Sequence, residues 1–243
     1  MDVLSLYTNI PHEKGIQAVE EILNKAAAKS IATIIITRLL TLILTLNNFV
    51  FNNHFFLQTK GCAMGTKCAP TYANILMEHF EEKFIDPKIN GLSMLYLRYI
   101  DDIFLVWTGS KKSLESFLQN VNQQHPSIKF EAQMSTKEIN FLDTTIYIKN
   151  NYLLTRLYRK PTDIQSYLHD YSYYPNATKR DIPYSQPLRM KRICSEMSEL
   201  TMNLNNLKST LKSRVKFMIF HEASRLFYIY ICLLYTSPSP RDS

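Results

Sequence analysis

The sequence predicts an α/β fold of the α+β kind, in which helices cover one face of a mixed, mainly antiparallel sheet. Short segments rich in β-branched and aromatic residues alternate along the chain with longer segments in which apolar residues recur every three or four positions. Two Asn-Asn pairs, at 52–53 and 150–151, each separate two of the short segments, as in tight hairpins. These observations favour one layer of strands and one layer of helices.

The first half of the chain begins with a strand-like apolar segment, residues 2–10, which ends at the turn residue Pro11. The helix expected after it has an apolar face formed by Ile16, Val19, Ile22 and Leu23. Residues 31–46 are strongly apolar, but they are only sixteen and include Arg38, whereas a membrane span takes about twenty. We therefore expect a buried helix there, followed by a hairpin over 49–57.

An acidic turn follows farther along. Tyr99, Ile100, Asp101 and Asp102 lie between residues 93–98 and 103–107, which are rich in β-branched and aromatic residues and are expected to be strands. A tight hairpin would present both carboxylates together. Mg²⁺ is bound through one or two carboxylates plus substrate phosphates, and polymerases use two such ions for phosphoryl transfer. The alternative is an ordinary acidic surface turn.

A third carboxylate, Asp2, opens the first strand-like segment, 99 positions before Asp101. A strand next to the acidic hairpin would bring Asp2 to the same site. Three carboxylates would complete a site for two metal ions.

A glycine-containing loop, residues 58–70, lies between these carboxylates and leads into a helix expected over 71–84. Glycine allows the backbone to approach a phosphate or a base pair closely. The loop holds two of the chain's five glycines, Gly61 and Gly65. It also holds Cys62 and Met64, for which the alternative to a binding role is that they fill gaps in the packing.

The second half is expected to continue with a helix through Leu114, Phe117, Leu118 and Val121. Strands are then expected over 128–132, 139–148 and 152–158, the last two joined at 150–151. An amphipathic helix follows, marked by Met197, Leu200, Leu204, Leu207 and Leu211.

The charge of the chain suits a nucleic-acid partner, since the net charge is +7 and the isoelectric point is about 9.1. Residues 156–192 hold eight basic residues against three acidic ones, together with six tyrosines. Cations among aromatic rings are typical of a groove that follows a nucleic-acid backbone and stacks on bases. A solvated basic face with tyrosines packed beneath it is the alternative.

The four cysteines, Cys62, Cys68, Cys194 and Cys232, lack the paired spacing of a zinc site or a disulfide framework. The histidines are scattered, which argues against a histidine-based hydrolase. No signal peptide precedes the first strand, and we expect a nuclear or cytoplasmic protein.

Six sequence strings occur in order between Asp2 and Ser195: DVxSLYTNIP, QxxGxAMGxxxAP, RYIDDIF, FLDTTI, YRKPTD and IPYSQPLRxKRICS. They resemble the reverse transcriptases of Penelope-like retroelements. Telomerase reverse transcriptase is a relative whose motifs fit less well. The resemblance implies a right-hand polymerase palm, two Mg²⁺ or Mn²⁺ ions, an RNA template, a DNA primer and deoxynucleoside triphosphates, and it favours the nucleus.

The resemblance also assigns roles to residues. Asp2 and Asp101 would be the principal metal ligands, with Asp102 supporting them. Tyr7 would be the ring that excludes a ribose 2′-hydroxyl, unless it is a core aromatic. Residues expected to line the nucleotide and template are Tyr7, Gln58, Gly61, Met64, Gly65 and Pro70.

Further candidates lie in the second half. Lys137 is a candidate general acid for the pyrophosphate leaving group, with a solvated loop lysine as the alternative. The expected nucleic-acid-binding residues are Arg159, Lys160, Arg189 and Arg192.

We expect three regions: a palm over 1–150, a primer-grip and thumb-proximal segment over 151–215, and a divergent tail over 216–243 that ends in text resembling a translated sequencing adapter. Only Met1 precedes Asp2, so the fingers are expected to be missing and the thumb incomplete. Two functions follow: an RNA-directed DNA polymerase domain of a retroelement, or a catalytically inactive remnant that binds nucleic acid.

Overall fold

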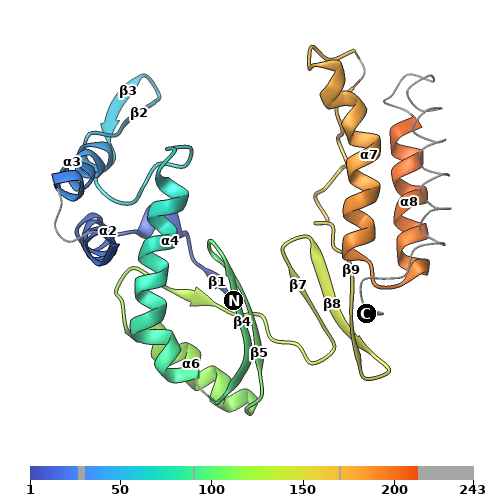
Figure 1. Cartoon of the computed structure of the whole chain (residues 1–243), viewed down its shortest axis with the longest axis horizontal. Helices are drawn as coiled ribbons and strands as arrows, with labels where there is room; N and C mark the ends of the chain where they lie inside the picture. Colours follow the sequence, from blue (N-terminus) through green and yellow to red (C-terminus); the bar gives the residue numbers. More distant parts are fainter. Residues whose placement is uncertain (27–30, 90, 170, 213–243) are drawn as a thin grey trace. The chain divides into compact units, whose positions relative to one another are not determined.

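The computed structural model describes residues 1–26, 31–89, 91–169 and 171–212 (Figure 1). The chain forms two compact units, Met1–Gln133 and Met134–Ser243. The predicted tail over 216–243 lies outside the described residues.

The first unit contains a four-stranded antiparallel sheet in the order β4-β5-β1-β6. Its strands are β4 (Ser93–Tyr99), β5 (Asp102–Trp107), β1 (Asp2–Val3) and β6 (Phe130–Glu131). The short β1 lies inside the sheet, so the chain's first residues are joined to strands about a hundred positions away. The strand predicted over 128–132 is shorter than expected.

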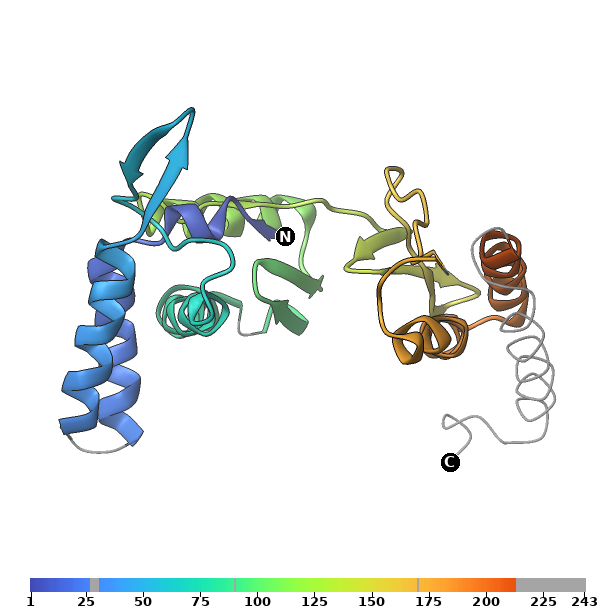
Figure 2. The ribbon, with the colours of Figure 1, turned by 90° about the horizontal axis from the view of Figure 1, so that it is seen from above.

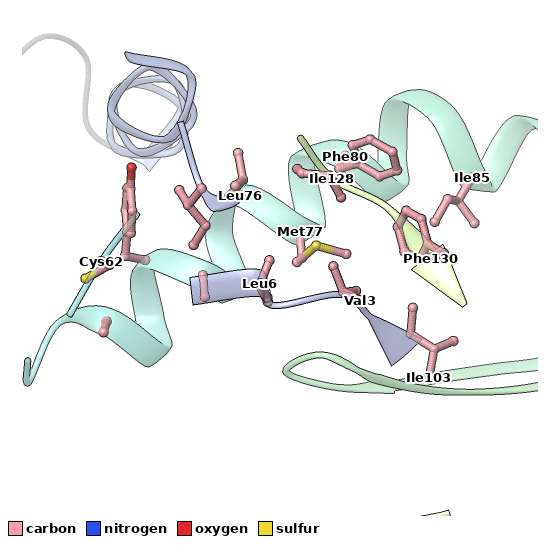
Figure 3. Packing of buried hydrophobic residues seen from close by; sticks show 14 of the residues in the cluster. Val3, Leu6, Cys62, Leu76, Met77, Phe80, Ile85, Ile103, Ile128 and Phe130 are labelled. Atoms are coloured by element: carbon pink, nitrogen blue, oxygen red, sulfur yellow. The ribbon is translucent and has the colours of Figure 1, made fainter. Parts of the chain in front are cut away.

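Two helices, α4 (Ala69–Phe80) and α6 (Lys111–Gln123), contribute to the core beneath the sheet. Figure 3 shows Val3 and Ile103 of the sheet directed toward Met77 of α4. All three side chains are buried. The burial of these apolar side chains is the main force that holds β1 against α4, and the predicted α/β architecture is confirmed.

The helix α4 changes its hydrogen-bond pattern at its end. It continues into a π-helical segment, η1 (Glu81–Ile85), and then into α5 (Asp86–Ile89). The prediction of a single helix over 71–84 did not include this change. A π-helical turn rotates the side chains that follow it, and such turns are frequent at functional sites.

The remaining helices of this unit are α1 (Leu6–Asn9), α2 (His12–Ala26) and α3 (Ile31–Thr45), followed by a hairpin of β2 (Asn48–Phe51) and β3 (His54–Leu57). Figure 2 shows α2 and α3 side by side. The hairpin turn uses Asn52 and Asn53, whose φ angles of 49° and 61° are those of the predicted tight turn.

The prediction that residues 31–46 form a buried helix is wrong about burial. The buried residues of α3 are Thr33, Leu40 and Leu44, because α2 covers only one stripe of it. Most of its large apolar side chains are exposed, namely Ile31, Ile34, Ile35, Ile36, Leu39, Leu42 and Ile43. No helix among the described residues is long and apolar enough to cross a membrane.

The second unit begins with a three-stranded antiparallel sheet, β7 (Glu138–Phe141), β8 (Thr144–Lys149) and β9 (Tyr152–Leu157). The single strand predicted over 139–148 is therefore wrong. A two-residue turn at Leu142 and Asp143, with Leu142 at φ 53°, divides it into β7 and β8. The predicted turn at 150–151 is confirmed.

Two helices, α7 (Asn176–Ile193) and α8 (Met197–Lys212), follow in the described part of the second unit. The spacing of apolar residues predicted α8. The helix α7 was not predicted, because Pro183 and Pro187 lie inside it and proline removes a helical hydrogen bond. The buried side chains between the two helices are Met190, Leu200, Leu204, Leu207 and Leu211.

Candidate active site

Two candidate carboxylates lie opposite each other. Asp2 of β1 and Asp102 of β5 are partners in the antiparallel register. The neighbouring pair, Met1 and Ile103, exchanges both backbone hydrogen bonds, at 2.7 and 2.8 Å. Asp2 and Asp102 therefore form a non-hydrogen-bonded pair, in which Cα atoms are typically about 4.5 Å apart and side chains share one face.

The third carboxylate lies in the turn between β4 and β5. Tyr99 pairs with Asp102, which leaves Ile100 and Asp101 as the two turn residues. Ile100 has φ 57°, a conformation that a β-branched residue rarely adopts. The backbone carbonyl of Asp101 accepts a hydrogen bond of 3.0 Å from the amide of Val3, so the turn is tied to β1.

Two of the three carboxylates, Asp2 and Asp102, lie on the face of the sheet away from the helices. Val3 and Ile103 point into the core, and side chains alternate along a strand. Asp2 and Asp102 therefore point to the other face, which they share with Tyr99. A substrate can reach this face without displacing the core.

The electrostatics of this site favour a cation. The pKa of Asp2 is raised, first by burial and then by the charges of Asp101 and Asp102. Within the described ranges, no lysine, arginine or histidine forms an ion pair with any of the three carboxylates. A divalent ion would relieve their mutual repulsion. No group of three or more His, Cys, Asp or Glu in the described parts of the chain has the geometry of a preformed metal site, and the residues fit an ion that is shared with substrate phosphates.

A second turn in this protein has the same form as the acidic turn, but its aspartate has a counter-charge. Phe141, Leu142, Asp143 and Thr144 form the same two-residue turn between paired strands, also with its first turn residue at positive φ. There the Nε of Arg189 donates to the Asp143 carboxylate at 2.7 Å. Asp143 has an arginine partner, whereas the corresponding Asp101 has none within the described residues.

The glycine loop packs against the segment that follows β1. The amide of Cys62 donates to the carbonyl of Tyr7 at 2.6 Å, and the amide of Gly61 donates to the carbonyl of Ile10 at 3.2 Å. The ring nitrogen Nε2 of His12 lies 2.7 Å from the carbonyl oxygen of Gly61. Gly61 is buried by these contacts, so it fixes the loop and does not line an open surface.

Tyr7 is half-buried on the short helix α1. Its pKa is raised by burial first and by the charge of Asp101 next. The structure thus brings Tyr7 near Asp101, as the predicted sugar-excluding role requires. Tyr7 also packs against the main core, so both roles considered for it are compatible with its position.

Most of the chain matches the model of one protein family. The sequence profile of the family described as "Reverse transcriptase (RNA-dependent DNA polymerase)" matches residues 1–221. The chain belongs to this reverse transcriptase family. A search of curated proteins gives no match.

Among solved structures, the reverse transcriptase domain is similar to apo telomerase from Candida tropicalis truncated from its C-terminal domain. The identity is 13% and the TM-score 0.49, and the match covers 63% of this chain. The chain spans 34% of the length of that telomerase chain.

The other predicted nucleotide-lining residues of the reverse transcriptase lie in the same loop or, for Pro70, at the start of the helix that follows it. Gln58 is engaged within it, since its Nε2 donates to the carbonyl of Lys60 at 2.9 Å. Met64 is 75% exposed. Gly65, at φ 97°, has open space around it, and Pro70 occupies the first turn of α4 and is exposed. Met64, Gly65 and Pro70 are therefore accessible, whereas Gly61 is not.

The predicted residues of the second unit vary in accessibility. Lys137, just before β7, and Lys160 and Arg192 are exposed, and Arg159 is half-buried. Arg189 is committed to Asp143. The sites in this unit stay predictions.

Sequence reasoning missed two residues beside the candidate site. Glu131 of β6 is the register partner of Asp2 on the side opposite Asp102, so the three acids form a row across three strands. Arg98 of β4 reaches the acidic turn from the core side. Glu131 could be found only from strand register. Arg98 could have been noticed in the sequence, because it directly precedes Tyr99, the first residue of the acidic motif.

Proposed function

We propose that the chain is the RNA-directed DNA polymerase domain of a Penelope-like retroelement, which adds deoxynucleotides to a primer 3′ end by two-metal nucleotidyl transfer. The family supplies the general activity. One observation carries the finer proposal: Asp2 and Asp102 are cross-strand partners beside Asp101, and none of these carboxylates forms an ion pair with a lysine, arginine or histidine among the described residues. The six motif strings, in order along the chain, support the retroelement origin.

In this proposal the three aspartates hold two Mg²⁺ or Mn²⁺ ions. When bound, the ions supply charge stabilisation for the attacking 3′ oxygen and the leaving pyrophosphate. Asp2 and Asp101 are the principal ligands, and Asp102 is the supporting carboxylate. The backbone bond between Val3 and Asp101 keeps β1 and the turn together, so the chain itself sets the spacing of its carboxylates.

The nucleotide would lie over the accessible part of the glycine loop, near Met64, Gly65 and Pro70. Tyr7 would border the sugar, since its ring lies near Asp101. Lys137 would protonate the leaving pyrophosphate. The template and primer would be held by the basic segment that contains Arg159, Lys160, Arg189 and Arg192, through phosphate contacts and stacking on exposed tyrosines such as Tyr173.

A primer-extension assay on an RNA template with Mg²⁺ or Mn²⁺ tests the proposal. Asp101→Asn removes a ligand charge without changing the side chain's size, and it should abolish extension while template binding stays near wild type. Glu20→Gln, on the exposed face of α2, is the matched control. Extension that survives in Asp101→Asn contradicts the site. A wild-type chain that binds template but does not extend the primer supports the inactive nucleic-acid-binding remnant.

A further inference from the structure

Behind the acidic turn lies a buried arginine. Arg98 of β4 is the register partner of Ile103, so it points to the core side of the sheet. Its side chain is only 13% exposed. Its Nε donates to Glu81 Oε1 at 2.6 Å, and its terminal nitrogen donates to Asn74 Oδ1 at 2.8 Å and to the backbone carbonyl of Ile100 at 3.3 Å. One guanidinium therefore joins α4, η1 and the acidic turn.

The carboxylate of Glu81, the partner of Arg98, is also held in place. Glu81 is the first residue of the π-helical segment η1, and its side chain is also 13% exposed. The hydroxyl of Tyr96 donates to the same Oε1 atom at 2.5 Å. Burial and the charge of Glu81 raise the pKa of Tyr96, which keeps its proton for this bond. A charged pair removed from water is tolerated when its hydrogen bonds are satisfied in this way.

The turn needs such support. Ile100 has a left-handed φ of 57°, which is strained for a β-branched side chain. Its side chain packs against the core, and its carbonyl accepts from Arg98. The next residue is Asp101. A turn that relaxed to an unstrained conformation would move the Asp101 carboxylate.

We infer that Arg98 is a positioning residue: through Glu81 and Asn74 it anchors the carbonyl of Ile100 and so fixes Asp101 and Asp102 in the geometry that binds the divalent ions. This inference rests on the proposed function. Arg98 lies on the opposite face of the sheet from Asp2 and Asp102, so it acts through the backbone of the turn and does not touch substrate.

Binding of Mn²⁺ alone, measured from the electron paramagnetic resonance signal of the free ion, tests the inference on the full chain. Arg98→Met removes the anchor and leaves the largely buried Glu81 with its Tyr96 hydrogen bond but without a counter-charge, which destabilises the fold. The double variant Arg98→Met, Glu81→Gln removes both charges, and urea unfolding should show stability recovered relative to Arg98→Met. Arg98→Lys keeps a charge beside Glu81 without the forked contact. Lys111→Met, which breaks the exposed pair with Glu115 on α6, is the matched control.

We expect Mn²⁺ affinity to fall about tenfold or more in Arg98→Lys and in the double variant, as it does when residues that orient metal ligands are lost. Lys111→Met should bind as wild type. Wild-type affinity in the double variant, once its stability has recovered, would overturn the inference, because it would give the pair a structural role only. Wild-type affinity in Arg98→Lys would overturn it as well.

The failure of the inference can be distinguished from that of the proposed function. Asp101→Asn should lose the Mn²⁺ binding that the wild-type chain shows. If Asp101→Asn binds Mn²⁺ as tightly as wild type, the metal site itself is misplaced. If Asp101→Asn loses Mn²⁺ binding while the folded Arg98 variants keep it, the metal site is supported and the positioning role of Arg98 is refuted.

Discussion

A Cβ atom on Gly61 would lie 2.4 Å from the carbonyl oxygen of Tyr7, closer than atoms can approach. Gly61 also has φ 72°, in the region that favours glycine. The segment from Tyr7 to Ile10 and the glycine loop thus touch at a point where no side chain fits. The hydrogen bond from the amide of Cys62 to the carbonyl of Tyr7 lies at the same point of contact.

Gly61→Ala should destabilise the fold more than Gly65→Ala does. Both positions have positive φ, at 72° and 97°, so both variants incur conformational strain of about 1–2 kcal/mol. A Cβ at Gly65 meets nothing within 4 Å, whereas one at Gly61 meets the backbone of Tyr7 and Thr8. The additional cost of Gly61→Ala should be about 1–3 kcal/mol in urea unfolding. Equal losses would mean that the loop moves away freely.

Tyr7→Ala should raise the incorporation of ribonucleotides relative to deoxynucleotides by at least about tenfold, or ~1.4 kcal/mol in the difference between activation free energies. The physical reason is the removal of a ring that lies near Asp101. Tyr7→Phe keeps the ring and should keep the discrimination. Primer extension with each nucleotide type measures the ratio, and an unchanged ratio in Tyr7→Ala would refute the sugar-excluding role.

Much of the first unit could be predicted from local sequence. The strands around the acidic turn and the hairpin at Asn52 and Asn53 follow from β-branched runs and turn residues. The pairing of Asp2 with Asp102 is consistent with the expectation of a neighbouring strand. Glu131 was missed because a register between distant strands leaves no local pattern.

The failures have physical causes. The burial expected for α3 was wrong because composition reports how apolar a helix is, but not how many neighbours cover it. The strand over 139–148 was divided by a turn whose first residue is Leu142, a residue that turn preferences disfavour. The helix α7 was missed because Pro183 and Pro187 are not expected inside a helix. In the last two cases tertiary context overrides local preference.

Asp2→Asn should abolish primer extension yet stabilise the metal-free fold slightly. The pKa of Asp2 is raised by burial and by Asp101 and Asp102, so its charge is unfavourable in the folded state. Because Asp2 is largely exposed to solvent, the gain should be below about 1 kcal/mol. Urea unfolding in the presence of a chelator measures it, with Glu20→Gln as the control. A loss of stability would indicate a favourable partner for this carboxylate.

The stability of the first unit should fall as the pH drops below about 6.5. His125 is buried, and its Nδ1 accepts the backbone amide of Ile128 at 3.2 Å. Burial, and then the charges of Lys14 and Lys129, lower its pKa from 6.5. The unfolded chain therefore binds the proton first, and the stabilisation that is complete above pH 6.5 is lost as the pH falls toward the folded-state pKa.

His125→Asn isolates this effect. The side-chain oxygen of asparagine can accept the same backbone amide but does not titrate in this range. Urea unfolding at about pH 7.5 and about pH 5.5 should show a smaller stability difference in the variant than in wild type. The same difference in both proteins would assign the pH dependence to other groups.

The two-residue strand β1 sets a limit on which changes of chain length this protein tolerates. Asp2 lies opposite Asp102 on one side and Glu131 on the other, while Val3 reaches the core. One residue inserted after Asp2 would shift the register of β1 and turn an acid inward or an apolar residue outward. One residue inserted at Ile100 would displace Asp101 from its backbone hydrogen bond with Val3. One residue inserted between Asn52 and Asn53 would lengthen only an exposed hairpin loop. In a library of single-residue insertions, we therefore expect no folded variants with an insertion in the acidic turn, and folded variants with an insertion in the Asn-Asn hairpin.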